Sequence, residues 1–275
     1  MTMLSINTNM GALNASQSSY SANKSMEASM ARLSSGKRIN SGADDAAGLF
    51  ITKRMATEIQ GLNQAVRNAS DAQALLMTTE GALEEVHTIL LRIRELAVQA
   101  SNGTYTTQDR VALQQEVTDL QTEITRISTD TTFNNLNMLQ GSHSTGITFQ
   151  IGADNTQTVT VSIASISLAS GLSLGGSSIS SATNAMNYIS TVDAALSTIS
   201  TNRGNYAAAI NRLDHAIANM QNVATNLSAA KGRVEDADFA AETSNLARVQ
   251  VLQQASMAML AQANASKQNI LSLFQ

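Results

Sequence analysis

Proline, cysteine and tryptophan are absent from this chain of 275 residues. A chain of this length would ordinarily contain roughly a dozen prolines, so their absence excludes collagen-like, PxxP-type and turn-dense β architectures. The absence of cysteine excludes disulfide scaffolds, thiolate zinc sites and cysteine nucleophiles. Aromatic residues make up only 3% of the chain although 43% is hydrophobic, which favours narrow seams between helices over a thick globular core.

Charge is also low. The formal net charge is -4 and the isoelectric point is near 5.4, which argues against binding to nucleic acid or anionic membranes. No apolar run approaches the roughly 20 residues of a membrane span. No side-chain charge precedes Lys24 and no apolar h-region is present there, so we expect neither a secretory signal peptide nor membrane insertion. The chain is expected to be cytosolic, or to leave the cell by a route that does not use that signal.

Hydrophobic periodicity predicts long helices. From residue 189 to 227 apolar residues recur at alternating steps of three and four, with one charged interruption at Arg203, which is the pattern of a coiled coil. A further helix is expected from about Asp44 to Ala100, a rod on the order of 80 Å long. Residues 101–104 supply a stop signal, and a break at residues 231–233 is expected before a final helix that begins near Glu235.

The middle of the chain has a different pattern. Apolar and polar residues alternate on both sides of a turn signal, which predicts a β-hairpin over residues 147–163. Residues 165–183 are rich in Ser and Gly and carry no charge, which predicts a flexible connector. The predicted fold is therefore mostly α, a long antiparallel coiled coil or helix bundle with a small β-hairpin, in which the N- and C-terminal helices are paired.

No constellation of residues supports catalysis. Glu84 and His87 have the i, i+3 spacing of a di-iron bundle, but there is no second copy of the motif, so a solvated surface pair is favoured. Asp44 and Asp45 are adjacent and do not face each other on a helix, so a role at a helix start is favoured. We therefore predict that the protein is not an enzyme and has no catalytic, cofactor-binding or metal-binding residues.

The densest basic cluster is a separate candidate site. It consists of Lys37, Arg38, Lys53 and Arg54. We favour ion pairing within helices or between subunits over nucleic-acid binding for these residues.

The two ends of the chain are amphipathic but nearly uncharged. After Arg248 the only charged side chain is Lys267. An apolar face that stayed exposed would promote aggregation, so we predict that it is buried against other copies of the chain; an intramolecular pairing of the two tails is the alternative. Polar Gln253 and Ser256 are predicted to fix the register of this seam. The predicted assembly seam consists of Ile6, Met10, Leu13, Val249, Leu252, Leu260, Ile270, Leu273 and Phe274.

Three long stretches resemble bacterial flagellin. They are ARLSSGKRINSGADDAAGLFITKRM (31–55), GLNQAVRNASDAQALLMTTEGALEEVHTILLRIRELAVQASNGT (61–104) and RVEDADFAAETSNLARVQVLQQASMAMLAQANASKQNILSLF (233–274). The segment QGSHSTGITFQIGADNTQTVTVSI (140–163) resembles the hairpin region of the same family. The large insertion that most members carry is missing, so the resemblance is to a short form that lacks the variable outer domains.

The resemblance implies a structural subunit that self-assembles into the helical flagellar filament used for swimming. It implies export through the flagellar type III system and a location outside the cell. It assigns residues 1–43 and 233–275 to paired inner-tube helices, the first including a linker. Residues 44–183 and 184–232 are assigned to the two parts of a surrounding shell domain.

The resemblance also implies partners. These are further copies of the chain, the flagellar cap and hook-filament junction proteins, and an export chaperone. Arg92, Leu96 and Glu116 match positions through which Toll-like receptor 5 recognises flagellins. The C-terminal ILSLF resembles the tail seen by the cytosolic inflammasome sensor of flagellin, with Phe274 in place of a common Leu.

Two other functions are weighed against this one. A hook-filament junction protein shares similar ends, but its middle normally departs more from flagellin. A helical signalling rod would share the heptads, but it would lack the β-hairpin and the uncharged ends.

Overall fold

The computed structural model describes residues 8–168, 171–176 and 178–271, with side chains described up to residue 266. The chain divides into two compact units. The terminal unit consists of Met1–Thr57 and Asn226–Gln275, and the central unit is Glu58–Thr225. Two long helices, α2 (Ala46–Ser101) and α4 (Ala182–Glu235), contribute residues to both units.

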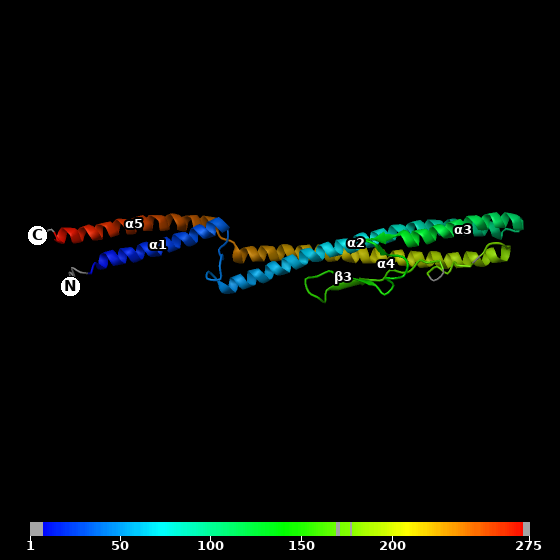
Figure 1. The fold of residues 1–275 in the computed structure, drawn as a ribbon, viewed down its shortest axis with the longest axis horizontal. Helices are drawn as coiled ribbons and strands as arrows, with labels where there is room; N and C mark the ends of the chain where they lie inside the picture. The colour runs from blue at the N-terminus through cyan, green and yellow to red at the C-terminus, as the bar shows by residue number, and fades with distance from the viewer. Residues whose placement is uncertain (1–7, 169–170, 177, 272–275) are drawn as a thin grey trace. The chain divides into compact units, whose positions relative to one another are not determined.

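The terminal unit is built on α1 (Met10–Ser35) and α5 (Phe239–Leu271), which lie antiparallel and side by side (Figure 1). Asn9 caps α1 because its side chain accepts a hydrogen bond from the Ala12 N–H at 3.1 Å. Gly36 ends α1 with φ at 70°, a left-handed conformation that glycine adopts without steric cost. The predicted pairing of the N- and C-terminal helices is confirmed.

The contact between α1 and α5 is a heptad seam of mostly small residues, which we call the inner seam. Its α1 positions are spaced alternately by three and four residues and are Ala12, Ala15, Ser19, Ala22, Met26, Ser29 and Leu33. Its α5 positions have the same spacing and are Leu246, Val249, Gln253, Ser256, Leu260 and Ala263. Because the α1 positions are mainly Ala and Ser, the two helices can approach each other closely.

The central unit combines α2, α3 (Thr107–Asp130) and α4. The buried stripe of α2 also follows steps of three and four, and it includes Leu62, Ala65, Ala69, Ala72, Leu76, Leu83, Val86, Leu90, Ile93, Ala97 and Ala100. The facing core positions of α4 include Ala185, Tyr188, Val192, Ala195, Ile199, Tyr206, Leu213 and Met220. Contacts of Arg94 with Asp193 and of Gln73 with Asp214, both at 2.6 Å, show that α2 and α4 are antiparallel. The predicted long antiparallel bundle is confirmed.

The turn between α2 and α3 is stabilised by side chains at both helix ends. Thr106 and Asp109 form a capping box at the start of α3. The guanidinium of Arg110, which is 9% exposed, donates hydrogen bonds to the carbonyls of Ala100 at 2.8 Å and Asn102 at 3.0 Å. These bonds satisfy carbonyls that the last turn of α2 leaves without helical partners.

Two small antiparallel pairs of strands follow α3. The first joins β1 (Thr132–Phe133) to β2 (Leu136–Asn137) and was not predicted from the sequence. The second joins β3 (Ile147–Gln150) to β4 (Thr158–Val161). Its register pairs Ile147 with Val161 and Gln150 with Thr158, which confirms the predicted hairpin.

Two features differ from the sequence predictions. The predicted break at residues 231–233 is wrong, because α4 continues to Glu235 and α5 begins at Phe239. The Glu235 carboxylate pairs with Lys231 one helical turn earlier, at 3.2 Å, which supports the last turn despite Gly232. The described residues of the predicted flexible connector pack against the core, since Ile166, Leu172, Leu174 and Ile179 are at most 3% exposed. The last two residues of the segment already belong to α4. Burying an apolar residue at intervals of a few positions holds this Ser-rich segment against the core.

Candidate assembly surface

Polar contacts set the register of the inner seam. Near one end the Asn9 amide donates a hydrogen bond to the carbonyl of Ala263 at 3.1 Å. About four turns further along α1, the Gln253 amide donates to the Asn23 side-chain oxygen at 2.6 Å. A slip by one position would break both contacts. Gln253, predicted to fix the register of a seam, thus makes its polar contact within the chain.

The predicted seam residues lie on more than one face of the helix pair. Val249 and Leu260 are half-buried at the inner seam. Met10, Leu13 and Leu252 are 61%, 56% and 52% exposed. Three of the remaining predictions, Ile6, Leu273 and Phe274, lie outside the described residues, as does the side chain of Ile270.

The exposed apolar residues of α1 form a second stripe. Met10 and Leu13, both predicted for the assembly seam, lie on one side of α1 with Tyr20, which is 68% exposed. At 3.6 residues per turn this stripe lies roughly 160° around the helix from the Ala15 and Ser19 face. α1 therefore uses one face to bind α5 and leaves an opposite apolar face uncovered.

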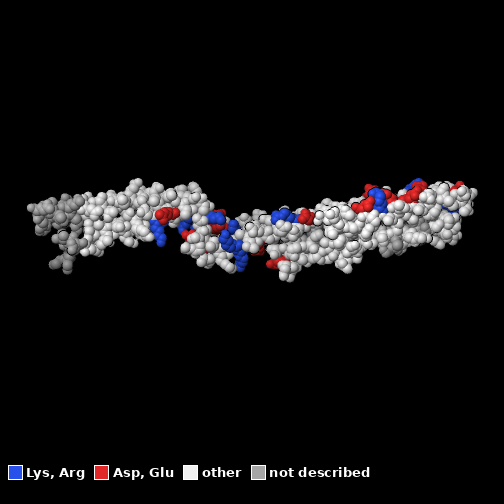
Figure 2. Space-filling model, viewed as in Figure 1, with Lys and Arg blue, Asp and Glu red and all other residues white. Residues whose placement is uncertain are grey.

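The surface of α5 is apolar on several sides. Val251, Leu252, Met257 and Met259 are between 52% and 65% exposed. No charged residue lies between Arg248 and Lys267, and on the face shown in Figure 2 the outer part of the α1–α5 pair is free of charge. A helix that exposes large apolar residues on several sides is normally covered by a partner.

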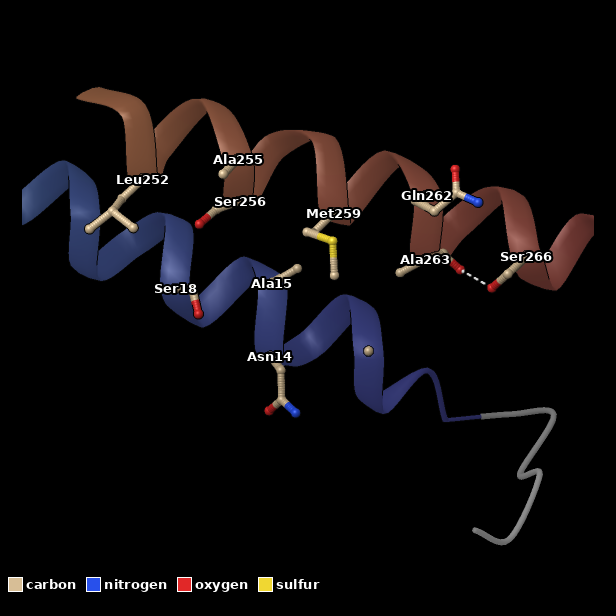
Figure 3. Close-up of a pocket in the computed structure, with 11 residues that line it drawn as sticks. Asn14, Ala15, Ser18, Leu252, Ala255, Ser256, Met259, Gln262, Ala263 and Ser266 are labelled. Carbon is tan, nitrogen blue, oxygen red and sulfur yellow. Dashed lines mark hydrogen bonds between the residues drawn. The ribbon is translucent and has the colours of Figure 1, made fainter. Parts of the chain in front are cut away.

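A groove runs between α1 and α5 (Figure 3). One part has a volume of about 490 Å³, and its lining residues include Gly11, Ala15, Ser18, Leu252, Ser256 and Met259. A neighbouring part of about 390 Å³ shares Ser18, Leu252 and Ser256 with it and continues along α1 to Ser25. Small side chains leave this space open, so a neighbouring helix could insert apolar side chains here.

A short clamp connects the segments that follow α1 and α4. The backbone N–H of Arg38 donates to the carbonyl of Glu235 at 2.7 Å, and the N–H of Ala237 donates to the carbonyl of Gly36 at 3.0 Å. The Lys37 ammonium lies 2.5 Å from the Glu235 carboxylate. Hydrogen bonding to Lys37 holds the pKa of Glu235 below its ordinary value, against the opposing effect of burial.

The clamp accounts for half of the predicted basic cluster. Lys37 is ion-paired, and the Arg38 guanidinium donates to the carbonyl of Val234 at 2.7 Å. Among the described residues no ion pair involves Lys53 or Arg54. In this cluster Lys37 and Arg38 therefore make structural contacts, whereas the cationic side chains of Lys53 and Arg54 form no ion pair among the described residues.

The residues matched to receptor recognition lie at different depths. The Arg92 guanidinium contacts the Glu116 carboxylate at 2.7 Å and Glu95 at 2.6 Å. These contacts raise the pKa of Arg92, with the hydrogen bond to Glu116 as the largest cause. Leu96 is only 1% exposed, so its side chain belongs to the core of the central unit and is inaccessible to a receptor.

The candidate metal motif takes part in an ion pair. Both Glu80 and Glu84 contact the guanidinium of Arg203, the charged interruption of the predicted heptad. His87 is half-buried rather than solvated, and its Nδ1 has no hydrogen-bond partner among the described residues. In the same range no cluster of three His, Asp or Glu side chains is suited to a metal ion. No helix in the described ranges is long and apolar enough to cross a membrane.

These features define a class of protein. A pair of helices with long uncharged stretches and exposed apolar residues, continuous in the chain with a helical bundle, is typical of a subunit that makes repeated contacts with copies of itself. Comparison with known families supports this. Residues 6–144 match the bacterial flagellin N-terminal helical region, and residues 189–274 match the bacterial flagellin C-terminal helical region. The chain belongs to the bacterial flagellin family.

Two curated relatives are similar to this chain over almost its full length. The chain is 42% identical to a flagellin of Halalkalibacterium halodurans over 98% of this chain and 99% of that protein. It is 41% identical to flagellar filament core protein flaB2 of Brachyspira hyodysenteriae, with the same coverage. It is also similar to the crystal structure of Bacillus cereus flagellin, with a TM-score of 0.51 and 33% identity over 60% of this chain and 94% of that one.

Proposed function

We propose that this chain is the structural subunit of a bacterial flagellar filament and that the exposed faces of α1 and α5 are the surfaces buried between subunits. The observation that carries this proposal is the apolar stripe of Met10, Leu13 and Tyr20, which is more than half exposed although α1 is already paired with α5. A single copy leaves this stripe and the groove uncovered. Repeated contacts that do not close on themselves produce an open helical polymer.

Residues 1–43 and 233–275, which lie within the terminal unit, are proposed to form the inner tube. Residues 44–183 and 184–232 are proposed to form the surrounding shell. The distribution of charge supports this division, because the described helices of the terminal unit have long uncharged stretches whereas surface ion pairs such as Arg94–Asp193 lie in the central unit. Export to the cell exterior and a role in motility follow from membership of the family.

Further partners are proposed on the same basis. They are the filament cap, the hook-filament junction proteins and an export chaperone. Recognition by Toll-like receptor 5 is proposed to use Arg92 and Glu116, which contact each other and are roughly half-exposed. The buried side chain of Leu96 is proposed to act indirectly, by packing α2 against the core. Recognition by the cytosolic inflammasome sensor of flagellin is proposed for the C-terminal tail.

Polymerisation of the purified chain tests the main proposal. We expect salt-induced filaments in negative-stain microscopy, and none from a chain that lacks residues 1–30. The sharper variant is Leu13→Ser with Tyr20→Ser, which removes exposed apolar groups without touching the inner seam. It should keep the helical content of the monomer and fail to polymerise. Met186→Ser, at an exposed methionine of the central unit, is the control for a general loss of surface apolarity.

Two outcomes for the variant Leu13→Ser with Tyr20→Ser would contradict the proposed contact. Normal filaments from the double variant would show that this stripe is not a contact between subunits. Loss of helical content in the monomer would instead mean that the two side chains support the fold of α1. Circular dichroism of the monomer separates these two outcomes.

A further inference from the structure

A methionine lies in the groove between α1 and α5. Met259 is 65% exposed, more than any other described methionine. Figure 3 shows its side chain pointing from α5 toward α1, across the space between the helices. Its thioether is therefore open to small solutes in the free subunit and lies where a neighbouring copy is proposed to insert.

The residues around Met259 are mostly small. The residues that line the groove with Met259 include Gly11, Ala15, Ala255 and Ala263. A Cβ atom added to Gly11 would lie 3.6 Å from the Cβ of Ala263, which is ordinary van der Waals contact, so α1 and α5 approach each other closely at this point. Methionine adapts to such a space because its side chain is unbranched and its sulfur is polarisable. A bulkier, polar group at the same position would fit poorly under a covering helix.

We propose that Met259 is an oxidation-sensitive assembly residue: peroxide converts its exposed thioether to the sulfoxide, and the sulfoxide weakens polymerisation. This inference rests on the proposed function. The sulfur lone pair attacks one peroxide oxygen, the O–O bond breaks and an S–O bond forms. The second oxygen leaves as water after taking up the proton of the transferred oxygen. Sulfur loses two electrons and the peroxide gains them.

The sulfoxide oxygen at Met259 is expected to weaken association between subunits, not the fold of the free subunit. In the free subunit the sulfoxide oxygen is exposed to water, so the monomer remains soluble and folded. In a filament a neighbouring copy would cover it and remove that water. Leaving a buried polar group poorly satisfied lowers an association constant by about tenfold or more. The monomer concentration needed for polymerisation should rise by the same factor.

Two other exposed methionines provide internal comparisons. Met257 is 54% exposed, and its sulfur accepts a hydrogen bond from the hydroxyl of Ser19 at 3.7 Å. Oxidation there would act on the pairing of α1 with α5 within one chain. Met186 is 59% exposed and lies on α4 in the central unit, so its oxidation should leave the groove unchanged.

The test uses the full chain and hydrogen peroxide. Monomer is oxidised to graded extents, the sulfoxide at each methionine is measured by peptide mass spectrometry, and salt-induced polymerisation is measured by sedimentation. We expect the critical concentration to rise with sulfoxide at residue 259 and to recover after treatment with methionine sulfoxide reductases. Met259→Leu, a swap that conserves volume, has its own critical concentration measured before treatment, and that value should stay constant at the peroxide dose that raises the critical concentration of the original chain. Met186→Leu should stay as sensitive as the original chain.

Two results would overturn the proposal. One is a Met259→Leu chain that loses polymerisation at the same peroxide dose as the original chain, which assigns the effect to another methionine. The other is equally fast oxidation of Met259 in filaments and in monomers, which shows that the groove stays open after assembly. Failure of the untreated chain to polymerise would overturn the proposed function itself, so the two failures are distinguishable.

Discussion

The Tyr206 hydroxyl accepts a hydrogen bond from the backbone N–H of Ala164 at 3.1 Å. Tyr206 lies on α4 and is 1% exposed, whereas Ala164 lies just beyond the end of β4. The bond therefore anchors the start of the segment at 165–183 to the helical core. Burial raises the pKa of the Tyr206 phenol above its ordinary value of 10.0.

Replacing this tyrosine tests the anchor. Tyr206→Phe leaves the Ala164 N–H without its partner, and we expect a loss of about 1–3 kcal/mol in the free energy of unfolding. Urea denaturation of the monomer measures it. Tyr188→Phe is the matched control, because the Gln121 amide that donates to Tyr188 at 2.8 Å also donates to the carbonyl of Leu174 at 3.3 Å. The control should lose less; an equal loss would show that the backbone partner has no special role.

The pH dependence of this anchor has a definite sign. Because the folded pKa of Tyr206 is raised, its contribution to stability is complete below the unfolded value near 10 and is lost as the pH rises through the higher folded value. The stability of the original chain should therefore fall more steeply above pH 10 than that of Tyr206→Phe. Parallel curves in denaturation experiments between neutral pH and the alkaline range would contradict this assignment.

The clamp between the chain segments after α1 and α4 predicts an acid-sensitive contact. The pKa of Glu235 is lowered from its ordinary value of 4.5, chiefly by the hydrogen bond from Lys37. Its stabilising effect is therefore complete above about pH 4.5 and is lost as the pH falls through the lower folded value. Hydrogen exchange at the Arg38 and Ala237 amides should show falling protection factors in that window.

Removing the charge should reproduce the effect at neutral pH. We expect Glu235→Gln to reduce protection of the Arg38 amide by about 1–3 kcal/mol, since hydrogen bonds to charged groups contribute in that range. Glu27→Gln, at an exposed glutamate in the middle of α1, controls for the change in net charge. Unchanged protection in Glu235→Gln would show that the backbone bonds hold the clamp without the carboxylate.

The sequence was sufficient to predict the long helices, because the heptads of α2 and α4 extend over many turns and one misplaced residue changes little. The hairpin was predictable from its alternating residues and turn. The path of residues 165–183 was not, since burial of Ile166 and Leu174 depends on a core assembled from distant helices. The end of α4 was misplaced because Gly232 is a break signal in isolation, whereas Lys231, Lys37 and Glu235 stabilise the turn through one local and one distant contact.

The apolar faces of α1 show a second limit of sequence reasoning. The prediction of Met10 and Leu13 as seam residues indicated an apolar face of α1 that needs a partner. It did not reveal that Ala15 and Ser19 make the intramolecular contact, because alanine and serine carry little hydrophobic signal. The intramolecular alternative and the predicted exposed stripe thus occupy different faces of one helix.

This division between faces predicts different effects of two leucine substitutions on the stability of the α1–α5 pair. Ala15→Leu adds volume at the inner seam, where Ala15 is 9% exposed, and should destabilise the α1–α5 pair by about 1–3 kcal/mol. Gln17→Leu, two residues later at an exposed position, should leave the pair unchanged. Hydrogen exchange of the α1 amides in the monomer measures both. Equal effects of the two variants would contradict the assignment of the inner seam.

Leu96 and Arg92 lie one turn apart on α2. Substituting either is expected to lower activation of the receptor, but for a different physical reason in each case. Leu96→Ala should cost about 2–5 kcal/mol because it leaves a cavity in the core. Arg92→Ala should change the free energy of unfolding little, since exposed ion pairs contribute little. If the proposed contact is correct, Arg92→Ala lowers activation of Toll-like receptor 5 in a reporter assay while urea denaturation is nearly unchanged. Leu96→Ala should lower activation only in proportion to its unfolded fraction. A folded Leu96→Ala chain that fails to activate the receptor, beside a fully active Arg92→Ala chain, would show that Arg92 is not part of the recognition surface.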